Sequence, residues 1–216
     1  MRSEAFETLE LFEQIVAQKI QEIDLSNDPA HDFLHFKRVV SLAKKICQLE
    51  HGKAAIVVPA AWLHDCVIIP KDSPLRHKAS RLSAEKALEI LASLNYPSKY
   101  YNDIAHAIEC HSFSANIEAL TLEAKIVQDA DRLDGLGAIG IARCFATAGM
   151  LKRPFYNHHD PFCERRPPDD SLYTVDHFFK KLFKTVDTLK TATGREEGKK
   201  RAEMMNSYLA ALKLEI

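Results

Sequence analysis

The chain of 216 residues is predicted to be an all-α protein that forms one domain over residues 1–216. Apolar residues recur at steps of three and four along most of the sequence, which is the period of one helix face. Strand-like stretches are no longer than the apolar runs at residues 56–58 and 67–69. With 46% hydrophobic residues and no internal repeat, a chain of this length can bury one substantial core.

The first two helices are predicted at residues 4–24 and 32–50. In both, apolar residues follow the helical period, and turn-forming residues at 27–29 separate the two segments. Asp32 is a candidate N-cap of the second helix, because its carboxylate can accept hydrogen bonds from first-turn amides. We therefore expect the second helix to begin just after Asp32.

A third helix is predicted at residues 54–66. It is apolar on nearly every side, so we expect it to be buried. Pro59, inside this segment, is expected to kink the helix or to start a new helical segment. A turn-rich loop follows at residues 67–74. Four more helices are predicted, at residues 77–94, 98–112, 119–134 and 137–149.

The last third of the chain is predicted to extend this helical core, which covers about residues 28–145. Residues 150–171 hold four prolines and show no apolar period, so a long loop is predicted there. Loops of this length are often lids or binding segments; the alternative is a loop that packs against the last two helices and braces them. Those helices are predicted at residues 173–190 and 195–214.

Composition and charge limit the classes of partner. The formal net charge is −1 and the isoelectric point is about 6.8, so no general attraction to nucleic acid or to anionic lipid is expected. No membrane-spanning run and no apolar signal core are present, which predicts a cytoplasmic protein. The five cysteines form no Cys-x-x-Cys pair and are expected to be buried thiols. A small-molecule partner is favoured, and a homodimer stays open.

Four short segments place imidazoles and carboxylates in or beside apolar helical runs. An unpaired charge in such places is costly unless something binds it, and a divalent cation would do so. The segments centre on His31 and His35, on His64 and Asp65, on His111, and on Asp129, Asp131 and Asp134. A mixed set of nitrogen and oxygen ligands suits Mn²⁺, Fe²⁺, Co²⁺ or Ni²⁺.

Helical geometry leaves several alternatives within these segments. His31 lies one turn before His35 on the same face, so either one can be the ligand and the other can orient it. Two residues on a helix diverge by about 200°, so only one of Asp129 and Asp131 can face a metal. Asp134 is either a carboxylate behind the ligands, or a proton-transfer group, or a solvent-exposed helix end.

The order of these motifs resembles the HD-domain superfamily of metal-dependent phosphohydrolases, through residues 28–145. Residues 128–143 resemble in particular a subgroup of small bacterial HD hydrolases. The resemblance implies an HD-domain helical bundle with a C-terminal helical extension. It also implies one divalent cation, Mn²⁺ by preference or else Mg²⁺, Fe²⁺, Co²⁺ or Ni²⁺. The ligands that it implies are His35, His64, Asp65 and Asp131.

Further residues are expected to act on the substrate. His111 resembles the position from which HD hydrolases offer an imidazole to the phosphate or to the leaving group. A phosphate that enters a site with two carboxylates also needs cations beyond the metal. The expected catalytic residues are Asp65, Lys71, His111 and Asp134, and the expected phosphate-binding residues are Lys71, Arg132, Arg143 and Arg165. Arg143 can equally pair with Asp134 or Asp129.

These observations predict a hydrolase of a phosphate ester or anhydride that uses a metal-activated water, with a nucleotide as substrate. Both a phosphohydrolase and a pyrophosphohydrolase fit. Ile68 stands where HD nucleotidases acting on monophosphates carry an acidic residue, which argues against that branch. A single metal is simpler than two, for which His106 and His111 would have to supply ligands. The alternatives are a metal- and nucleotide-binding regulatory module with little turnover, and an HD-type oxygenase.

Overall fold

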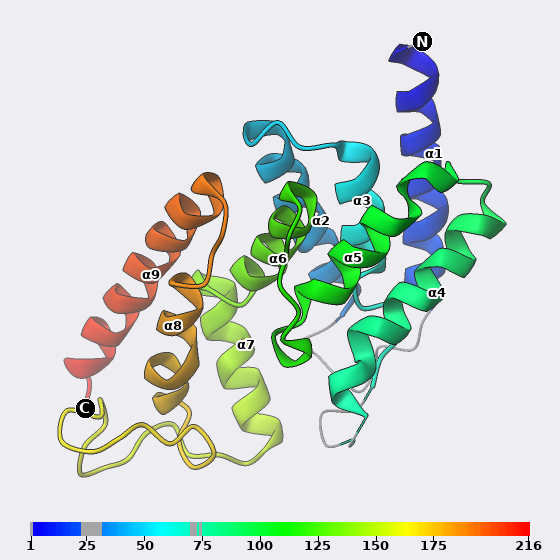
Figure 1. Ribbon diagram of the computed structural model, residues 1–216. Coiled ribbons are helices and arrows are strands. Elements are labelled where there is room, and N and C mark those ends of the chain that lie inside the picture. The colour runs from blue at the N-terminus through cyan, green and yellow to red at the C-terminus, as the bar shows by residue number, and fades with distance from the viewer. Residues whose placement is uncertain (1, 23–31, 70–72, 74) are drawn as a thin grey trace.

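The computed structural model describes residues 2–22, 32–69, 73 and 75–216, and of residues 2–8 and 76 only the backbone. All regular structure in these residues is helical (Figure 1), which confirms the all-α prediction. The α-helices are α1 (Arg2–Gln21), α2 (Phe33–Leu49), α3 (Ala54–Leu63), α4 (Ala79–Ser93), α5 (Tyr101–His111), α6 (Leu122–Asp134), α7 (Gly137–Met150), α8 (Phe183–Val186) and α9 (Ala192–Lys213). Three 3₁₀ turns, η1 (Arg76–Lys78), η2 (Ser98–Tyr100) and η3 (Phe113–Ala115), and a π-helical turn, η4 (Phe178–Leu182), complete them.

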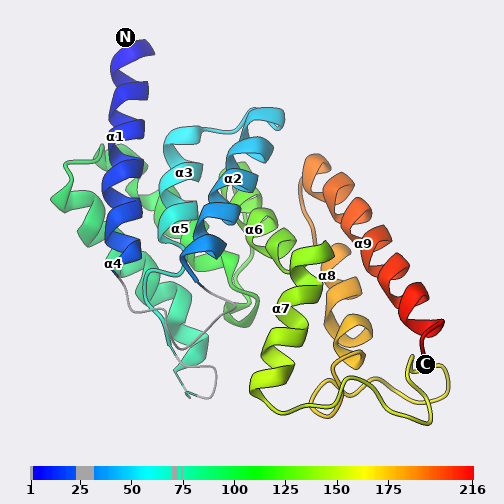
Figure 2. The ribbon, with the colours of Figure 1, turned by 180° about the vertical axis from the view of Figure 1, so that it is seen from behind.

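The helices form a central group with a further group on each side (Figures 1 and 2). Helices α2, α3, α5 and α6 make the centre, α1 and α4 lie on one side, and α7, α8 and α9 lie on the other. As the sequence predicts, α3 is buried, with every residue from Ile56 to Leu63 enclosed. Among the described helices, none is both long enough and apolar enough to cross a membrane.

Pro59 neither breaks nor ends α3, although it removes one helical hydrogen bond. The missing amide of Pro59 frees the carbonyl of Ala55, four residues earlier. The hydroxyl of Tyr96 donates to that oxygen at 2.7 Å, so the buried acceptor is satisfied. Pro59 therefore does not start a new helical segment, and a side chain from outside the helix replaces the lost donor.

α3 is three residues shorter than predicted, and this difference shapes the site. Nδ1 of His64 donates to the carbonyl of Ala61 at 2.8 Å, the acceptor that the amide of Asp65 would use if the helix continued. Cys66 instead bonds back to Leu63 in a turn. The side chain of His64 thus ends its own helix, and His64 and Asp65 stand at its terminus.

Local signals explain the neighbouring helices. Asp32 caps α2, as predicted, by accepting a hydrogen bond from the amide of His35 at 2.8 Å. Between α6 and α7 the chain turns tightly, and a Cβ atom at Gly140 would overlap the carbonyl of Gly135. Glycine at this position therefore lets α7 start directly beside the end of α6, which brings Arg143 back towards Asp134.

The segment after residue 150 is a long loop, as predicted, but the helix predicted at 173–190 is shorter. It is divided into η4 and α8, and the chain before it is fixed to the start of the loop. Thr174 donates to the carbonyl of Pro154 and Val175 to that of Phe155, so these residues pair with the loop and are not helical. The predicted helix at 195–214 is confirmed as α9, capped by Thr191.

Candidate metal centre and adjoining cleft

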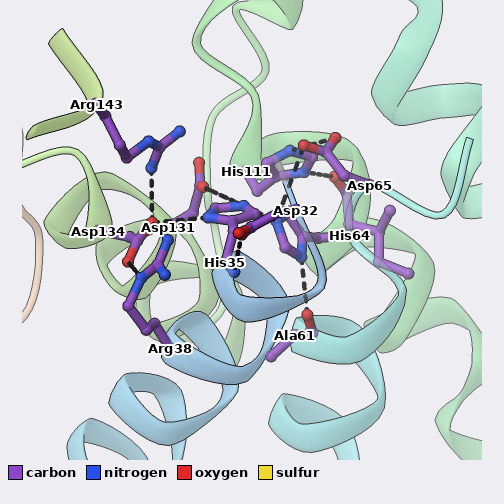
Figure 3. A network of polar contacts seen from close by, with 11 residues as sticks. Asp32, His35, Arg38, Ala61, His64, Asp65, His111, Asp131, Asp134 and Arg143 are labelled. Atoms are coloured by element: carbon purple, nitrogen blue, oxygen red, sulfur yellow. Dashed lines mark hydrogen bonds and ion pairs between the residues drawn. The ribbon is translucent and has the colours of Figure 1, made fainter. Parts of the chain in front are cut away.

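Three buried histidines meet at the ends of α2, α3 and α5 (Figure 3). His64, at the end of α3, is fully buried. A carbonyl can only accept, so its bond to Ala61 places the ring proton on Nδ1 and leaves a lone pair on Nε2. Burial, partly opposed by Asp65, lowers the pKa of His64 to about 4. His64 is thus neutral and presents Nε2 to the site.

His35 is oriented from behind by Asp134. Its Nδ1 donates to Oδ2 of Asp134 at 2.8 Å, and its Nε2 lies 3.2 Å from Nε2 of His64. Asp134 is only 1% exposed and also accepts hydrogen bonds from Arg38 and Arg143, each with a shortest contact of 2.6 Å. Burial raises the pKa of Asp134, but the bonds from His35 and Arg38 outweigh it and hold this pKa well below its ordinary value. The solvent-exposed alternative for Asp134 is therefore wrong.

His111, at the end of α5, faces the same point from a third direction. Its Nδ1 donates to the carbonyl of Ile108 at 2.6 Å, and its Nε2 lies 3.4 Å from Oδ1 of Asp65. Burial lowers the pKa of His111, but the contact with Asp65 outweighs it and raises this pKa to about 8. The rings of His64 and His111 are nearly perpendicular, with centroids 4.9 Å apart.

Asp131 and Asp129 point to opposite sides of α6, as the helical period requires. Oδ1 of Asp131 lies 3.7 Å from Nε2 of His35 and 3.9 Å from Nε2 of His64. Asp129 is fully buried and accepts hydrogen bonds from the amides of Lys190 and Thr191 and from the hydroxyl of Thr191. Asp129 thus joins α6 to the start of α9. Within the described residues, no hydrogen bond or ion pair links its carboxylate to a basic side chain or to a histidine.

The arrangement fits a divalent cation. The Nε2 atoms of His35 and His64 lie 3.2 Å apart, and neighbouring ligand nitrogens on one ion stand about 3 Å apart. Two groups have one ligand atom per residue within 4.8 Å of one another: His35, His64 and Asp131, and His64, Asp65 and His111. His64 belongs to both. The second group places His111 beside the predicted ligands His64 and Asp65. The sequence predicts a role for His111 at the substrate, and a role as a ligand only for a second metal.

A cleft of about 580 Å³ opens beside Asp131. One wall is α7 from Gly140 on, with Leu151 just beyond its end, and the other is η4 with α8. Its remaining lining comes from the end of α6, from η3 and from both ends of the long loop. The charged residues that line it are Asp131, Arg132, Arg143, Arg153, Asp170 and Lys181, and His177 lines it too.

The four predicted phosphate-binding residues have different outcomes. Arg132 and Arg143 line the cleft; Arg132 donates to the carbonyl of Thr188 and lies over the ring of Phe113. Arg165 does not line this cleft, because its guanidinium donates to the carbonyl of His159 on the far part of the loop. Lys71 lies outside the described residues, as does His31.

Sequence reasoning missed two groups of residues. Arg38 donates to Asp134 through two nitrogens, at 2.6 and 3.1 Å. His177 lines the cleft and bonds to Asp170 at 2.8 Å. No periodic signal could have found this pair, because its residues lie on a loop and just before a π-helical turn. His106, by contrast, accepts a bond from the amide of Leu120 and lies outside both ligand groups.

Comparison with known proteins agrees with this geometry. The family model described as HD domain matches residues 32–136. YpgQ of Bacillus subtilis (strain 168), an uncharacterized protein, is 31% identical over 201 residues, which are 91% of this chain and 90% of YpgQ. The crystal structure of YpgQ in complex with ADP has a TM-score of 0.76 and 31% identity, and the match covers 97% of each chain.

A second solved structure, of an HD-superfamily hydrolase from Bacillus thuringiensis, has a TM-score of 0.74 and 28% identity. The match covers 96% of this chain and 97% of that one. The matched family region holds His35, His64, Asp65 and Asp131, and the two relatives extend the likeness over the C-terminal helices. The chain belongs to the HD-domain superfamily.

Proposed function

We propose that this protein is a metal-dependent hydrolase of a phosphate ester or anhydride, and that its substrate is a nucleotide. The observation that carries the proposal is the position of the cluster. Two buried imidazoles and the carboxylate of Asp131 converge at the end of a cleft that also contains arginine and lysine side chains. A cation-binding centre that opens on a cationic cleft suits a substrate with several negative charges.

In this proposal the cation is held by His35, His64, Asp65 and Asp131. Bound there, a divalent cation supplies Lewis acidity and makes water a nucleophile at neutral pH. Asp134 fixes the ring of His35, and Arg38 fixes Asp134. Asp65 and His111 lie side by side, and we assign them to hydrogen bonds with the attacking water or with the leaving oxygen. Mn²⁺ is the preferred ion.

The nucleotide is supported by the dimensions and charge of the cleft and by one relative. A volume of about 580 Å³ lies in the range of small-molecule sites, about 300–1,000 Å³. The structure of YpgQ holds ADP. Arg132 and Arg143 stand at the metal end, where they can offset the charge of a phosphate chain. Hydrolysis of a nucleoside triphosphate to monophosphate and pyrophosphate is one reaction that this cleft can accommodate, and Lys71 stays a predicted phosphate ligand.

The test begins with metal analysis of the purified protein, followed by a nucleotide panel assayed with that metal and with Mn²⁺. We expect turnover of at least one nucleotide, and its loss in His64→Ala. The matched control is His158→Ala, which removes an exposed histidine of the long loop. ADP binding without turnover of any nucleotide would contradict the hydrolase and favour a regulatory module. A stoichiometric iron content with a di-iron optical spectrum would favour an oxygenase.

A further inference from the structure

The cleft has two ends that differ in chemistry. The cleft follows α7 from Gly140 to Leu151, just past the end of the helix, which is about 16 Å at about 1.5 Å per residue. Asp131 and Arg132 lie at the first end, where Arg132 donates to the carbonyl of Thr188 just beyond α8. The chain approaches that point from His177 through η4 and α8, which lie beside α7 in both views (Figures 1 and 2). His177 therefore lies at the other end, away from the histidine cluster.

His177 is oriented by Asp170. Its Nδ1 lies 2.8 Å from Oδ2 of Asp170, and since a carboxylate can only accept, Nδ1 carries the proton. Nε2 is then left with a lone pair. The side chain of His177 is 25% exposed and lines the cleft, and within the described part of the chain nothing donates to Nε2. An oriented acceptor without a protein donor thus stands in the cleft.

The charges around His177 keep it an acceptor. Burial lowers its pKa, the bond to Asp170 opposes this, and the nearby charges of Lys181 and Arg153 lower it further. The ring is therefore neutral at pH 7. Leu151, which is 60% exposed, adds an apolar surface at this end. In contrast to the metal end, this end suits an uncharged, partly apolar group better than a phosphate.

We propose that His177, held by Asp170, is a specificity-determining residue that accepts a hydrogen bond from the nucleoside, at the end of the cleft away from the histidine cluster. The inference rests on the proposed function, because it concerns the nucleotide of that same site. The phosphate chain then lies towards Arg132 and Arg143. The donor is an N–H or O–H group, which a nucleoside offers either as a sugar hydroxyl or as a base amino group.

Two variants of His177 distinguish the loss of its hydrogen-bond acceptor from the loss of its side-chain packing. In His177→Asn the shorter amide can keep the bond to Asp170 but cannot reach the position of Nε2, whereas His177→Gln can. We expect His177→Asn to weaken binding of ADP about tenfold, as for one lost hydrogen bond, and to leave binding of inorganic pyrophosphate unchanged. His177→Gln should recover part of the loss. Both affinities are measured by calorimetry with Mn²⁺, and the control His158→Ala should change neither.

Analogues of ADP identify the donor. If the donor is a sugar hydroxyl, His177→Asn should no longer matter for the 2′-deoxy or the 3′-deoxy analogue. If it is the base amino group, His177→Asn should no longer matter for inosine diphosphate. An equal loss for ADP and pyrophosphate, or no loss for either, would overturn the proposal. A selective loss for ADP that persists with every analogue would overturn it too, because no donor would then account for it.

The two proposals fail in different ways. If the unaltered protein hydrolyses a nucleotide but the His177 variants bind ADP normally, only the role of His177 is wrong. If the unaltered protein neither binds ADP nor hydrolyses any nucleotide, the proposed function is wrong and the inference falls with it. The melting temperature of each variant, compared with that of His158→Ala, reports whether a weaker affinity comes from lost stability.

Discussion

The two ends of the cleft are built from different kinds of structure. At the metal end the side chains of His35, His64, His111 and Asp131 project from four packed helices, and the three imidazoles are almost completely buried. Each imidazole has its Nδ1 fixed by an acceptor on its own helix or on α6. At the other end the acceptor is a partly exposed histidine, held by one residue of a long loop.

The loop that forms the second end is itself held by two buried carboxylates. Asp160 accepts hydrogen bonds from three successive backbone amides, and Asp176 binds the guanidinium of Arg166. None of the residues that make these bonds lines the cleft. The two ends are therefore supported differently: packed helices fix the histidine cluster, while a polar network supports an end whose residues can change without disturbing that cluster.

The largest effect is expected at His64, which belongs to both ligand groups. His64→Ala should abolish stoichiometric metal binding, as should Asp65→Ala. Because metal bound only by the folded state adds to its stability, EDTA should lower the melting temperature of the unaltered protein. At a free metal concentration 100 times Kd this contribution is about 2.7 kcal/mol. An unchanged melting temperature in EDTA would argue strongly against the metal centre.

The next effect distinguishes the two faces of α6. Asp131→Asn should weaken metal binding far more than Asp129→Asn, because only Asp131 faces the histidines. Asp129→Asn should instead lower the free energy of unfolding, since its carboxylate accepts three bonds at the start of α9. Metal titration and urea unfolding of both variants measure the two quantities. The opposite ranking for metal affinity would move the ligand to Asp129.

The network under the loop gives a further contrast between two neighbouring arginines. Arg166→Ala should reduce the free energy of unfolding by about 2–3 kcal/mol, because it leaves the fully buried Asp176 without its charged partner. Arg165→Ala removes only a bond to a backbone carbonyl and should have little effect. Neither variant should raise KM for a nucleoside triphosphate. A selective rise in KM would restore the idea of a phosphate-binding lid.

The residue behind the first ligand is expected to have a smaller effect on the metal. Asp134→Asn keeps the size of the side chain but weakens the bond that orients His35, so metal affinity should fall about 10- to 100-fold. Arg38→Gln should act in the same direction, and less strongly, because Arg143 still holds Asp134. Metal titration measures both. A full loss of metal in Asp134→Asn would indicate that Asp134 itself is a ligand.

The helices and the cluster of histidines and carboxylates could be predicted because their signals are local. Apolar periodicity located the helices, and Asp32 marked the start of α2. The placement of His64 and Asp65 after an apolar run indicated a buried polar group. By contrast, the spacing of Asp129, Asp131 and Asp134 showed only that the first two must diverge. It took the packing of α2, α6 and α7 to show that Asp134 lies behind His35.

The other end of the cleft could not be predicted, because its bonds connect residues without a periodic pattern. The sequence left two alternatives for the loop at 150–171, a lid or binding segment and a brace. Some of its residues line the cleft, and others pair away from the cleft lining. Arg153 and Asp170 line the cleft, whereas Arg166 pairs with Asp176 away from it. Arg165 was assigned to the substrate from its charge alone. Charge in a sequence does not tell which arginine has a carboxylate partner within its own loop.

The smallest effect is a pH dependence at the base of the loop. Hydrogen bonds from the amides of Arg165, Glu164 and Arg166 outweigh burial and hold the pKa of Asp160 below its ordinary value. A carboxyl group whose pKa is lower in the folded chain than in the unfolded chain stabilises the fold at pH values above the unfolded pKa, about 3.9. This stabilisation is lost as the pH falls through the folded pKa. The destabilisation caused by Asp160→Asn should therefore be larger at pH 6 than at pH 3.

Urea unfolding of the unaltered protein and of Asp160→Asn at both pH values measures this difference. Asp169→Asn is a matched comparison, because bonds from the hydroxyl and amide of Ser171 lower the pKa of Asp169 on the exposed part of the same loop. Its carboxylate orders fewer amides, so its pH-dependent contribution should be the smaller of the two. Equal destabilisation by Asp160→Asn at pH 3 and pH 6 would mean that the loop is held by packing, and that the proposed polar support of the second end is wrong.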